Sequence, residues 1–311
     1  MADSRSPISR GIGELAQWKL VLLIALLSAL LGITGASPLV PTLRVTLGET
    51  LAGDHFLRNA PTFAPTDFFD LLDQKGPALY GYRAASRWAG ILAVVLQIFL
   101  AGGMAVVLGR GPFGFGQLFE PARRNFWHNI KCFFLFVVAC GIALSVWLGG
   151  GFYLRNKVFE KSPPDSPVHR LSWWILALGA ILIYAALSIL YDFARASRRF
   201  SPTVGAWRGF RFARAAVSGS WLRALAIWLF WFVAGGVAWL ALLALAWGMP
   251  AVSPPAILVM FLVLAAALAA RSAARVAAWG SWIAFLEPRA RRAMADTVRI
   301  RYTVARTPIA T

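Results

Sequence analysis

The sequence predicts an all-α membrane protein with six transmembrane helices and both termini in the cytoplasm. Hydrophobic residues make up 59% of the 311 residues and charged residues only 14%, whereas about a quarter of an ordinary soluble domain is charged. The apolar residues also gather into runs of roughly 20, the length that a helix needs to cross a hydrocarbon core about 30 Å thick. The expected spans cover residues 18–36, 84–109, 131–154, 171–191, 222–248 and 255–275. Together they make residues 1–311 a single membrane domain.

The orientation follows from the connections between spans, because Lys and Arg are retained on the cytoplasmic side of a membrane. The connection 192–223 carries seven arginines against one aspartate, and 110–131 carries four basic residues against one glutamate. Both are therefore expected inside. The connection 37–83 carries four basic and five acidic residues, which makes it the extracytoplasmic loop. The basic segment 276–311 becomes a cytoplasmic tail.

Two cytoplasmic connections repeat one design, a basic amphipathic elbow that leads into the next span. Pro121 opens the first elbow and Ser201 opens the second, and in each the apolar residues recur at helical spacing. The apolar residues are Phe119, Ala122, Phe126 and Ile130 in the first elbow, and Ala206, Phe210, Ala213 and Val217 in the second. We expect both elbows to be interfacial helices. Their shared pattern indicates a pseudo-repeat over 84–154 and 171–248.

The basic faces of these elbows are the predicted lipid contacts. Each arginine near an anionic membrane surface contributes on the order of 1 kcal/mol. The residues predicted to bind lipid headgroups are Arg208, Arg211, Arg214, Arg123 and Arg124. A plainer interpretation stays open, in which these residues only set the topology.

Charges near the inner ends of two spans predict an ion pair. Arg271 and Arg275 lie one helical turn apart near the inner end of the last span, and Asp192 and Arg195 follow the fourth. The arginines of the last span either extend to the interface or meet Asp192. These four residues are therefore the ion-pair candidates.

Residues that would carry chemistry are sparse. The sequence Gly109-x-Gly111-x-x-Gly114 matches the dinucleotide fingerprint, but it follows a membrane span and lacks the strand that the fingerprint requires. Cys132 and Cys140 both fall in the third span, where they are expected to be small apolar fillers. The net charge of +18 is explained by topology, since no soluble basic module is present to read nucleic acid. We expect no catalytic residue, metal site or cofactor.

Three segments carry a resemblance to a group of proteins. They are Phe99-Leu100-Ala101-Gly102-Gly103, Phe119-x-x-Ala122-Arg123-x-x-Phe126-Trp127 and Tyr191-Asp192-Phe193-Ala194-Arg195. Over about residues 85–215 the chain resembles uncharacterised bacterial integral membrane proteins with six spans. The resemblance implies the same topology, and it assigns no site residue.

These observations favour a multi-pass accessory or scaffold protein of the bacterial cytoplasmic (inner) membrane that is not an enzyme. Its expected contacts are anionic lipid headgroups and other membrane proteins or further copies of itself. The alternative is a permease subunit of a transport system, and an ATP-driven system is one form of it. No Walker sequence lies in the chain, so the ATPase would be a separate protein.

Overall fold

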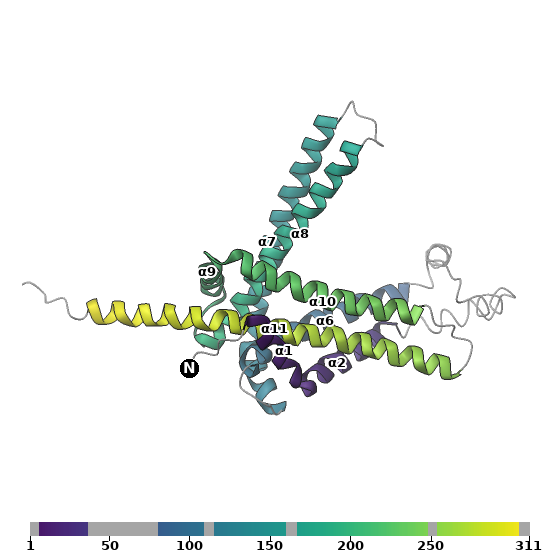
Figure 1. Ribbon diagram of the computed structural model, residues 1–311, viewed down its shortest axis with the longest axis horizontal. Helices are drawn as coiled ribbons and strands as arrows, with labels where there is room; N and C mark the ends of the chain where they lie inside the picture. Colours follow the sequence, from purple (N-terminus) through teal and green to yellow (C-terminus); the bar gives the residue numbers. More distant parts are fainter. Residues whose placement is uncertain (1–5, 37–79, 109–114, 160–166, 248–253, 305–311) are drawn as a thin grey trace, which may run out of the picture. The chain divides into compact units, whose positions relative to one another are not determined.

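The protein is built from helices. The computed structural model describes residues 6–36, 80–108, 115–159, 167–247 and 254–304 (Figure 1). Within these ranges the chain forms helices and turns, with no strand. The elements are α1 (Pro7–Gly13), η1 (Glu14–Ala16), α2 (Trp18–Ala36), α6 (Tyr80–Val107), α7 (Phe115–Phe159), α8 (Pro167–Phe200), α9 (Ala206–Val217), α10 (Trp221–Trp247) and α11 (Pro254–Val304). The prediction of an all-α protein is confirmed.

Five of the described helices contain segments that are long and apolar enough to cross a membrane. These segments are Ala84–Val107, Gly116–Lys157, Arg170–Phe200, Trp221–Leu245 and Leu262–Ala290. A sixth span results if the short helical segment Pro7–Ala16 and the following helix together form one. The chain is therefore a helical protein with several candidate membrane spans. The loop predicted over 37–83 lies outside the described residues up to position 79.

The first elbow is not a separate helix, contrary to the sequence prediction. It is the N-terminal part of α7, which has 45 residues and is ~68 Å long at 1.5 Å per residue. Pro121 lies inside this helix rather than opening it. Proline removes one intrahelical hydrogen bond, but the neighbouring Leu118 and Ala122 are fully buried. Their packing holds the helix on both sides of the proline.

The second elbow does contain a separate helix, α9. It begins at Ala206, after Gly205 in extended conformation, and therefore later than Ser201. It ends at Val217, and Gly219 follows with a φ of 78°. Glycine adopts this left-handed conformation without steric cost, which allows the sharp turn into α10. The two elbows thus differ in local structure despite their similar sequences.

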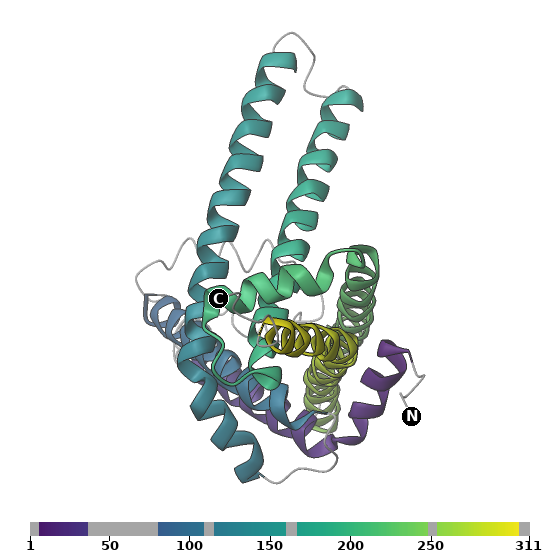
Figure 2. The same cartoon turned by 90° about the vertical axis from the view of Figure 1, so that its left-hand side faces the viewer.

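The chain divides into two compact units. One unit, called the elbow unit below, consists of Met1–Ile12, Ile98–Leu229 and Ala278–Thr311. In it, α7 and α8 run antiparallel and side by side (Figures 1 and 2), and α9 contacts both helices. The other unit consists of Gly13–Gln97 and Phe230–Ala277. In it, α10 and α11 approach closely, because a Cβ added at Gly235 would lie 2.9 Å from that of Ala274.

The segment predicted as a basic tail from residue 276 begins as buried helix. α11 runs without a break to Val304. Its residues Val276, Trp279, Trp282, Ile283, Phe285 and Leu286 are all buried. In the elbow unit, the Phe193 ring of α8 lies 4.9 Å from that of Trp282 and 5.5 Å from that of Phe285, between centroids. This part of α11 is therefore core, because its aromatic residues have α8 to pack against.

Candidate functional site

The C-terminal part of α8 holds a buried ion pair. Asp192 and Arg195 are three residues apart, a spacing that places two side chains on one face of a helix. A guanidinium nitrogen of Arg195 donates a hydrogen bond to Oδ1 of Asp192. The side chain of Arg195 is 5% exposed and that of Asp192 is 18% exposed. Because a buried charge is costly without a partner, the carboxylate is what makes this buried guanidinium tolerable.

Two aromatic rings complete the surroundings of Arg195. Its guanidinium carbon lies 3.9 Å from the ring centroid of Tyr191 and 5.0 Å from that of Trp279. Cations over aromatic faces gain electrostatic energy, and more so when they are shielded from water. Nε of Arg195 is buried without a hydrogen-bond partner within the described structure. The ion pair thus lies within α8, and the contact of Arg195 with the Trp279 ring joins α8 to α11 inside the elbow unit.

The C-terminal half of α6 packs against α7 through glycines and side-chain amides. A Cβ added at Gly102 would lie 2.9 Å from Nδ2 of Asn129, and one at Gly103 would lie 2.7 Å from Cδ1 of Leu118. Nδ2 of Asn129 donates to the carbonyl of Ile98 at 3.1 Å, and Nδ2 of Asn125 donates to that of Gly102 at 3.4 Å. Because glycine has no side chain, α6 and α7 approach closely enough at these positions for the two amides to bond to the backbone of α6.

Arg199 holds the C-terminal end of α6. Its Nη1 donates to the carbonyl oxygens of Ala105 at 2.8 Å, Val106 at 3.2 Å and Leu108 at 2.5 Å. The last carbonyls of an α-helix lack intrahelical partners and carry partial negative charge. The guanidinium supplies both the missing donors and the opposite charge. It thereby ties the end of α8 to the end of α6.

The three segments of the resemblance meet in the elbow unit. The Phe99 ring lies 6.0 Å from that of Phe119 and 6.1 Å from that of Phe126, between centroids. Nε2 of His128 lies 3.3 Å from the carbonyl oxygen of Ala194, which joins α7 to the third segment. These contacts are packing and backbone bonding. The buried motif residues, among them Leu100, Ala122 and Phe193, therefore belong to the core of this unit, whereas Arg123 and Trp127 lie on its surface.

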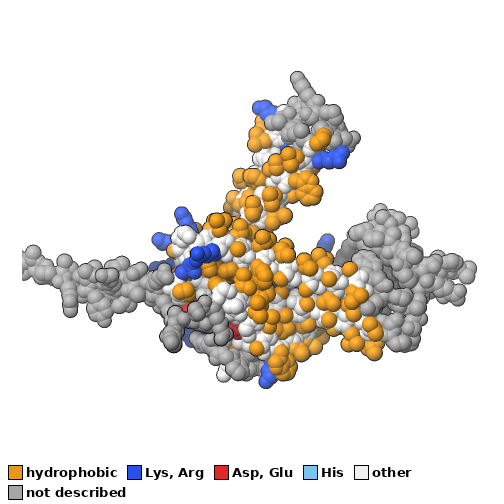
Figure 3. All heavy atoms as spheres, viewed as in Figure 1, with side chains coloured by type: hydrophobic (Ala, Val, Ile, Leu, Met, Phe, Trp, Pro, Cys, Tyr) orange, Lys and Arg blue, Asp and Glu red, His pale blue; other side chains and the backbone are white. Residues whose placement is uncertain are grey.

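α9 packs on α8 with one face and presents arginine on the other. Its buried residues are Ala206, Gly209, Ala213, Ala216 and Val217. A Cβ added at Gly209 would lie 3.0 Å from the carbonyl oxygen of Ala194, so the two helices are in close contact. Arg208, Arg211 and Arg214 are exposed. Figure 3 shows Lys and Arg side chains gathered where Figure 1 places α9.

Exposed basic residues also lie on the N-terminal part of α7. Arg123 and Arg124 are both exposed, and Arg123 pairs with Glu120 at 3.6 Å across the surface. All five predicted headgroup residues thus belong to the elbow unit and face outward. Exposed indoles accompany them on both helices, since Trp127 is 69% and Trp207 is 67% exposed. We call the exposed arginines and tryptophan of α9, namely Trp207, Arg208, Arg211 and Arg214, the basic face.

The other two ion-pair candidates lie in the second unit. The guanidinium carbon of Arg271 is 5.4 Å from the ring centroid of Trp239, and Arg275 follows one turn later on the same helix. The carboxylate of Asp192 bonds to Arg195. A pairing of Asp192 with Arg271 or Arg275 stays a prediction.

In the part of the chain that the structure describes, groups with catalytic potential are buried or scattered. Among the described residues, no three His, Cys, Asp or Glu side chains are grouped so that they could hold a metal ion. Sγ of Cys132 lies 3.5 Å from Nε2 of His128, but the two residues are 0% and 3% exposed. A nucleophile needs access to its substrate, and this pair has none.

Several residues that organise the elbow unit were not singled out by their sequence pattern. They are Asn125, Asn129 and Arg199. One signal was present, because Asn125, His128 and Asn129 recur at helical spacing on the side of α7 that also carries Ala122. All four of these residues are buried. Buried polar residues at such spacing indicate bonds to a neighbouring helix.

Comparison of the chain with protein-family models, with curated proteins and with solved structures gives no match. The resemblance to bacterial six-span proteins therefore stays a prediction.

Proposed function

We propose that the chain is an accessory or scaffold protein of the bacterial inner membrane. It contacts anionic lipid headgroups through the basic face and packs against partner membrane proteins or further copies of itself. The observation that carries the proposal is the division of α9 into two faces. Its small residues pack on α8, and its arginines and Trp207 point outward.

The composition of the basic face suits the headgroup region of a membrane. Indole rings favour this region because they combine an apolar body with a polar N–H. Three arginines at ~1 kcal/mol each sum to ~3 kcal/mol of attraction to an anionic surface, which is ~100-fold in a binding constant. Because α9 is held against α8 at Gly209, these charges project from a fixed position.

The test replaces Arg208, Arg211 and Arg214 together by glutamine in the full-length protein. Phospholipids retained after purification in mild detergent are then counted by mass spectrometry. We expect fewer anionic lipids per protein and an unchanged helical circular dichroism spectrum, because the substituted side chains are exposed. Unchanged retention of anionic lipid in a folded variant contradicts the proposal.

A matched control replaces Lys157 and Arg170, exposed cations at the other end of the α7–α8 hairpin, by glutamine. It should change lipid retention less per charge removed, because that end is predicted to face outward. Proteins that accompany the wild type are identified in the same purification. Stoichiometric recovery of an ATPase would favour the permease alternative, with the elbows as its docking elements.

A further inference from the structure

A cavity lies beside the turn that joins α9 to α10. It has a volume of about 360 Å³ and is lined by residues of the elbow unit alone. The lining residues are Phe212, Ala215, Ala216, Ser218, Gly219, Ser220 and Arg289. Ligand cavities span about 300–1,000 Å³. This one therefore suits a compact polar group rather than a whole lipid molecule.

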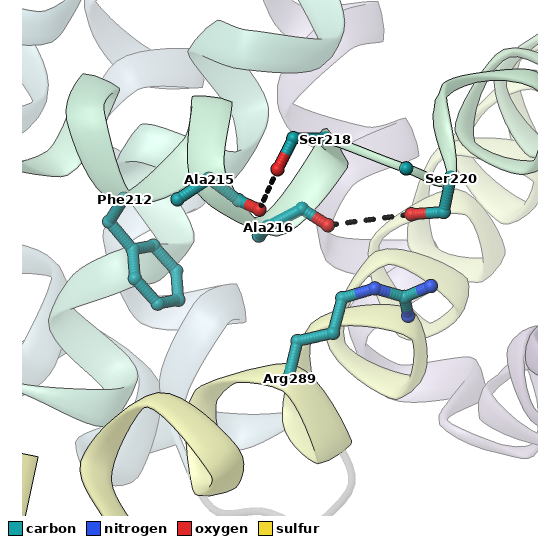
Figure 4. A pocket seen from close by; sticks show the side chains of 7 residues that line it. Phe212, Ala215, Ala216, Ser218, Ser220 and Arg289 are labelled. Atoms are coloured by element: carbon teal, nitrogen blue, oxygen red, sulfur yellow. Dashed lines mark hydrogen bonds between the residues drawn. The ribbon is translucent and has the colours of Figure 1, made fainter. Parts of the chain in front are cut away.

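Arg289 supplies the only formal charge among the lining residues. Its side chain rises from α11 toward the turn, and its guanidinium lies below Ser220 in the view of Figure 4. Nη1 donates to the carbonyl of Phe285 at 2.7 Å, and the guanidinium carbon lies 3.7 Å from the Phe285 ring centroid. These contacts fix the direction of the side chain. A planar guanidinium held in one orientation matches the geometry of a phosphate.

The two serines offer hydrogen-bond acceptors on the opposite wall of the cavity. Ser218 Oγ donates to the carbonyl of Ala215 at 2.7 Å, and Ser220 Oγ donates to that of Ala216 at 3.5 Å (Figure 4). The last carbonyls of α9 would otherwise direct partial negative charge outward. Each hydroxyl that has donated its hydrogen still has lone pairs, which accept hydrogen bonds. A ligand with a phosphate and with hydroxyl or ammonium donors fits both kinds of group.

We propose that this cavity binds a phosphate ester of the size of a phospholipid headgroup, with Arg289 on the phosphate and Ser218 and Ser220 on the alcohol part. The inference rests on the proposed function in one respect, that α9 lies at an anionic lipid surface. It adds a discrete site to the diffuse attraction of the basic face. Phe212 and Ala215 form the apolar side of this site.

The experiment measures binding to the full-length protein in detergent by native mass spectrometry. The probes are phosphatidylglycerol, phosphatidylcholine and soluble glycerol phosphate. We expect one phosphatidylglycerol to bind at least tenfold more tightly than phosphatidylcholine. Arg289→Gln should abolish this single binding event, and Arg289→Lys should weaken it less. Ala215→Phe keeps the charge and fills the cavity, so it should also abolish binding.

Controls separate this site from the basic face. Arg271→Gln, which removes an exposed arginine of the other unit, should leave the bound lipid in place. The triple glutamine variant of Arg208, Arg211 and Arg214 should lose the loosely held anionic lipids and keep the single tight one. If the triple variant retains as much loosely held anionic lipid as the wild type while Arg289→Gln loses the single tight lipid, the basic face fails and the cavity stands.

The remaining outcomes decide the source of the ligand and the fate of the proposal. The site is assigned to a soluble phosphate ester if glycerol phosphate binds the wild type as tightly as phosphatidylglycerol does and if Arg289→Gln and Ala215→Phe both abolish its binding. Wild-type binding in a folded Arg289→Gln and in a folded Ala215→Phe variant overturns the proposal. So does the absence of any tight binding to the wild-type protein.

Discussion

Breaking the ion pair of α8 is expected to destabilise the elbow unit strongly. In Asp192→Asn, the Arg195 guanidinium loses its carboxylate while its side chain remains 5% exposed in the wild-type geometry. Removing one partner of a buried pair costs about 3–5 kcal/mol. Because the Asp192 side chain is 18% exposed and the pair is therefore not fully buried, we expect the lower end, about 3 kcal/mol. That is more than 100-fold in the folding equilibrium.

The chain contains a matched control for this prediction. Glu120 and Arg123 have the same three-residue spacing, but their side chains are 67% and 79% exposed. Exposed pairs contribute about 0.2–1 kcal/mol, so Glu120→Gln should cost less than about 0.5 kcal/mol. The double variant Asp192→Asn with Arg195→Gln removes both charges. The double variant should lose less stability than the two single variants lose in sum, because it leaves no unpaired charge buried.

The assay is equilibrium unfolding of the purified protein in mixed detergent micelles, followed by tryptophan fluorescence and circular dichroism. Trp279 lies 5.0 Å from the guanidinium carbon of Arg195, so the fluorescence includes a probe beside the pair. A loss of stability in Asp192→Asn that stays within about 1 kcal/mol of that in Glu120→Gln would refute the reasoning. It would mean that water solvates the guanidinium.

Two further predictions concern packing and topology. Gly103→Ala should cost about 1–3 kcal/mol of stability, because its Cβ would clash with the backbone carbonyl oxygen of Leu118, which cannot move aside, and would lie 2.7 Å from Cδ1 of the same residue. Gly90→Ala in the same helix meets nothing within 4 Å and should be neutral or stabilising. Similar melting temperatures for the two variants would argue against close α6–α7 packing. A cysteine at Asp70, in the predicted outer loop, should react with an impermeant thiol reagent in intact spheroplasts, and labelling only after lysis would reverse the topology.

The structure modifies the sequence prediction where local signals compete with packing. Proline is favoured at the first position of a helix, so the local sequence predicts that a helix begins at Pro121. In the structure, the packing of buried neighbouring residues allows α7 to continue past this proline. The segment from 276 contains arginines and was expected to be a tail, yet its aromatic residues are buried in the elbow unit. In both places the contacts that decide the outcome come from residues distant in the sequence.

The candidate site also contains one part that the sequence pattern predicts and one part that it does not predict. The outward arginines of α9 follow from helical spacing, because a helix that packs with one face exposes the other. The cavity at Arg289 does not follow from spacing, since Arg289 of α11 and Ser218 of the turn after α9 lie far apart in the chain. No local pattern relates the two residues.

The sequence by itself determined that this is a helical protein with several segments able to cross a membrane. The physical reason is that lipid offers no hydrogen bonds, so an apolar run of sufficient length satisfies its backbone only as a helix. Tertiary structure alone decided which charges are buried and which are exposed. Arg195 and Arg208 are the same residue type in one basic segment, but only Arg195 finds a carboxylate and two aromatic rings. Burial of a charge depends on such partners. Asp192 and Tyr191 lie on the same helix as Arg195, whereas Trp279 reaches it because α11 packs on α8.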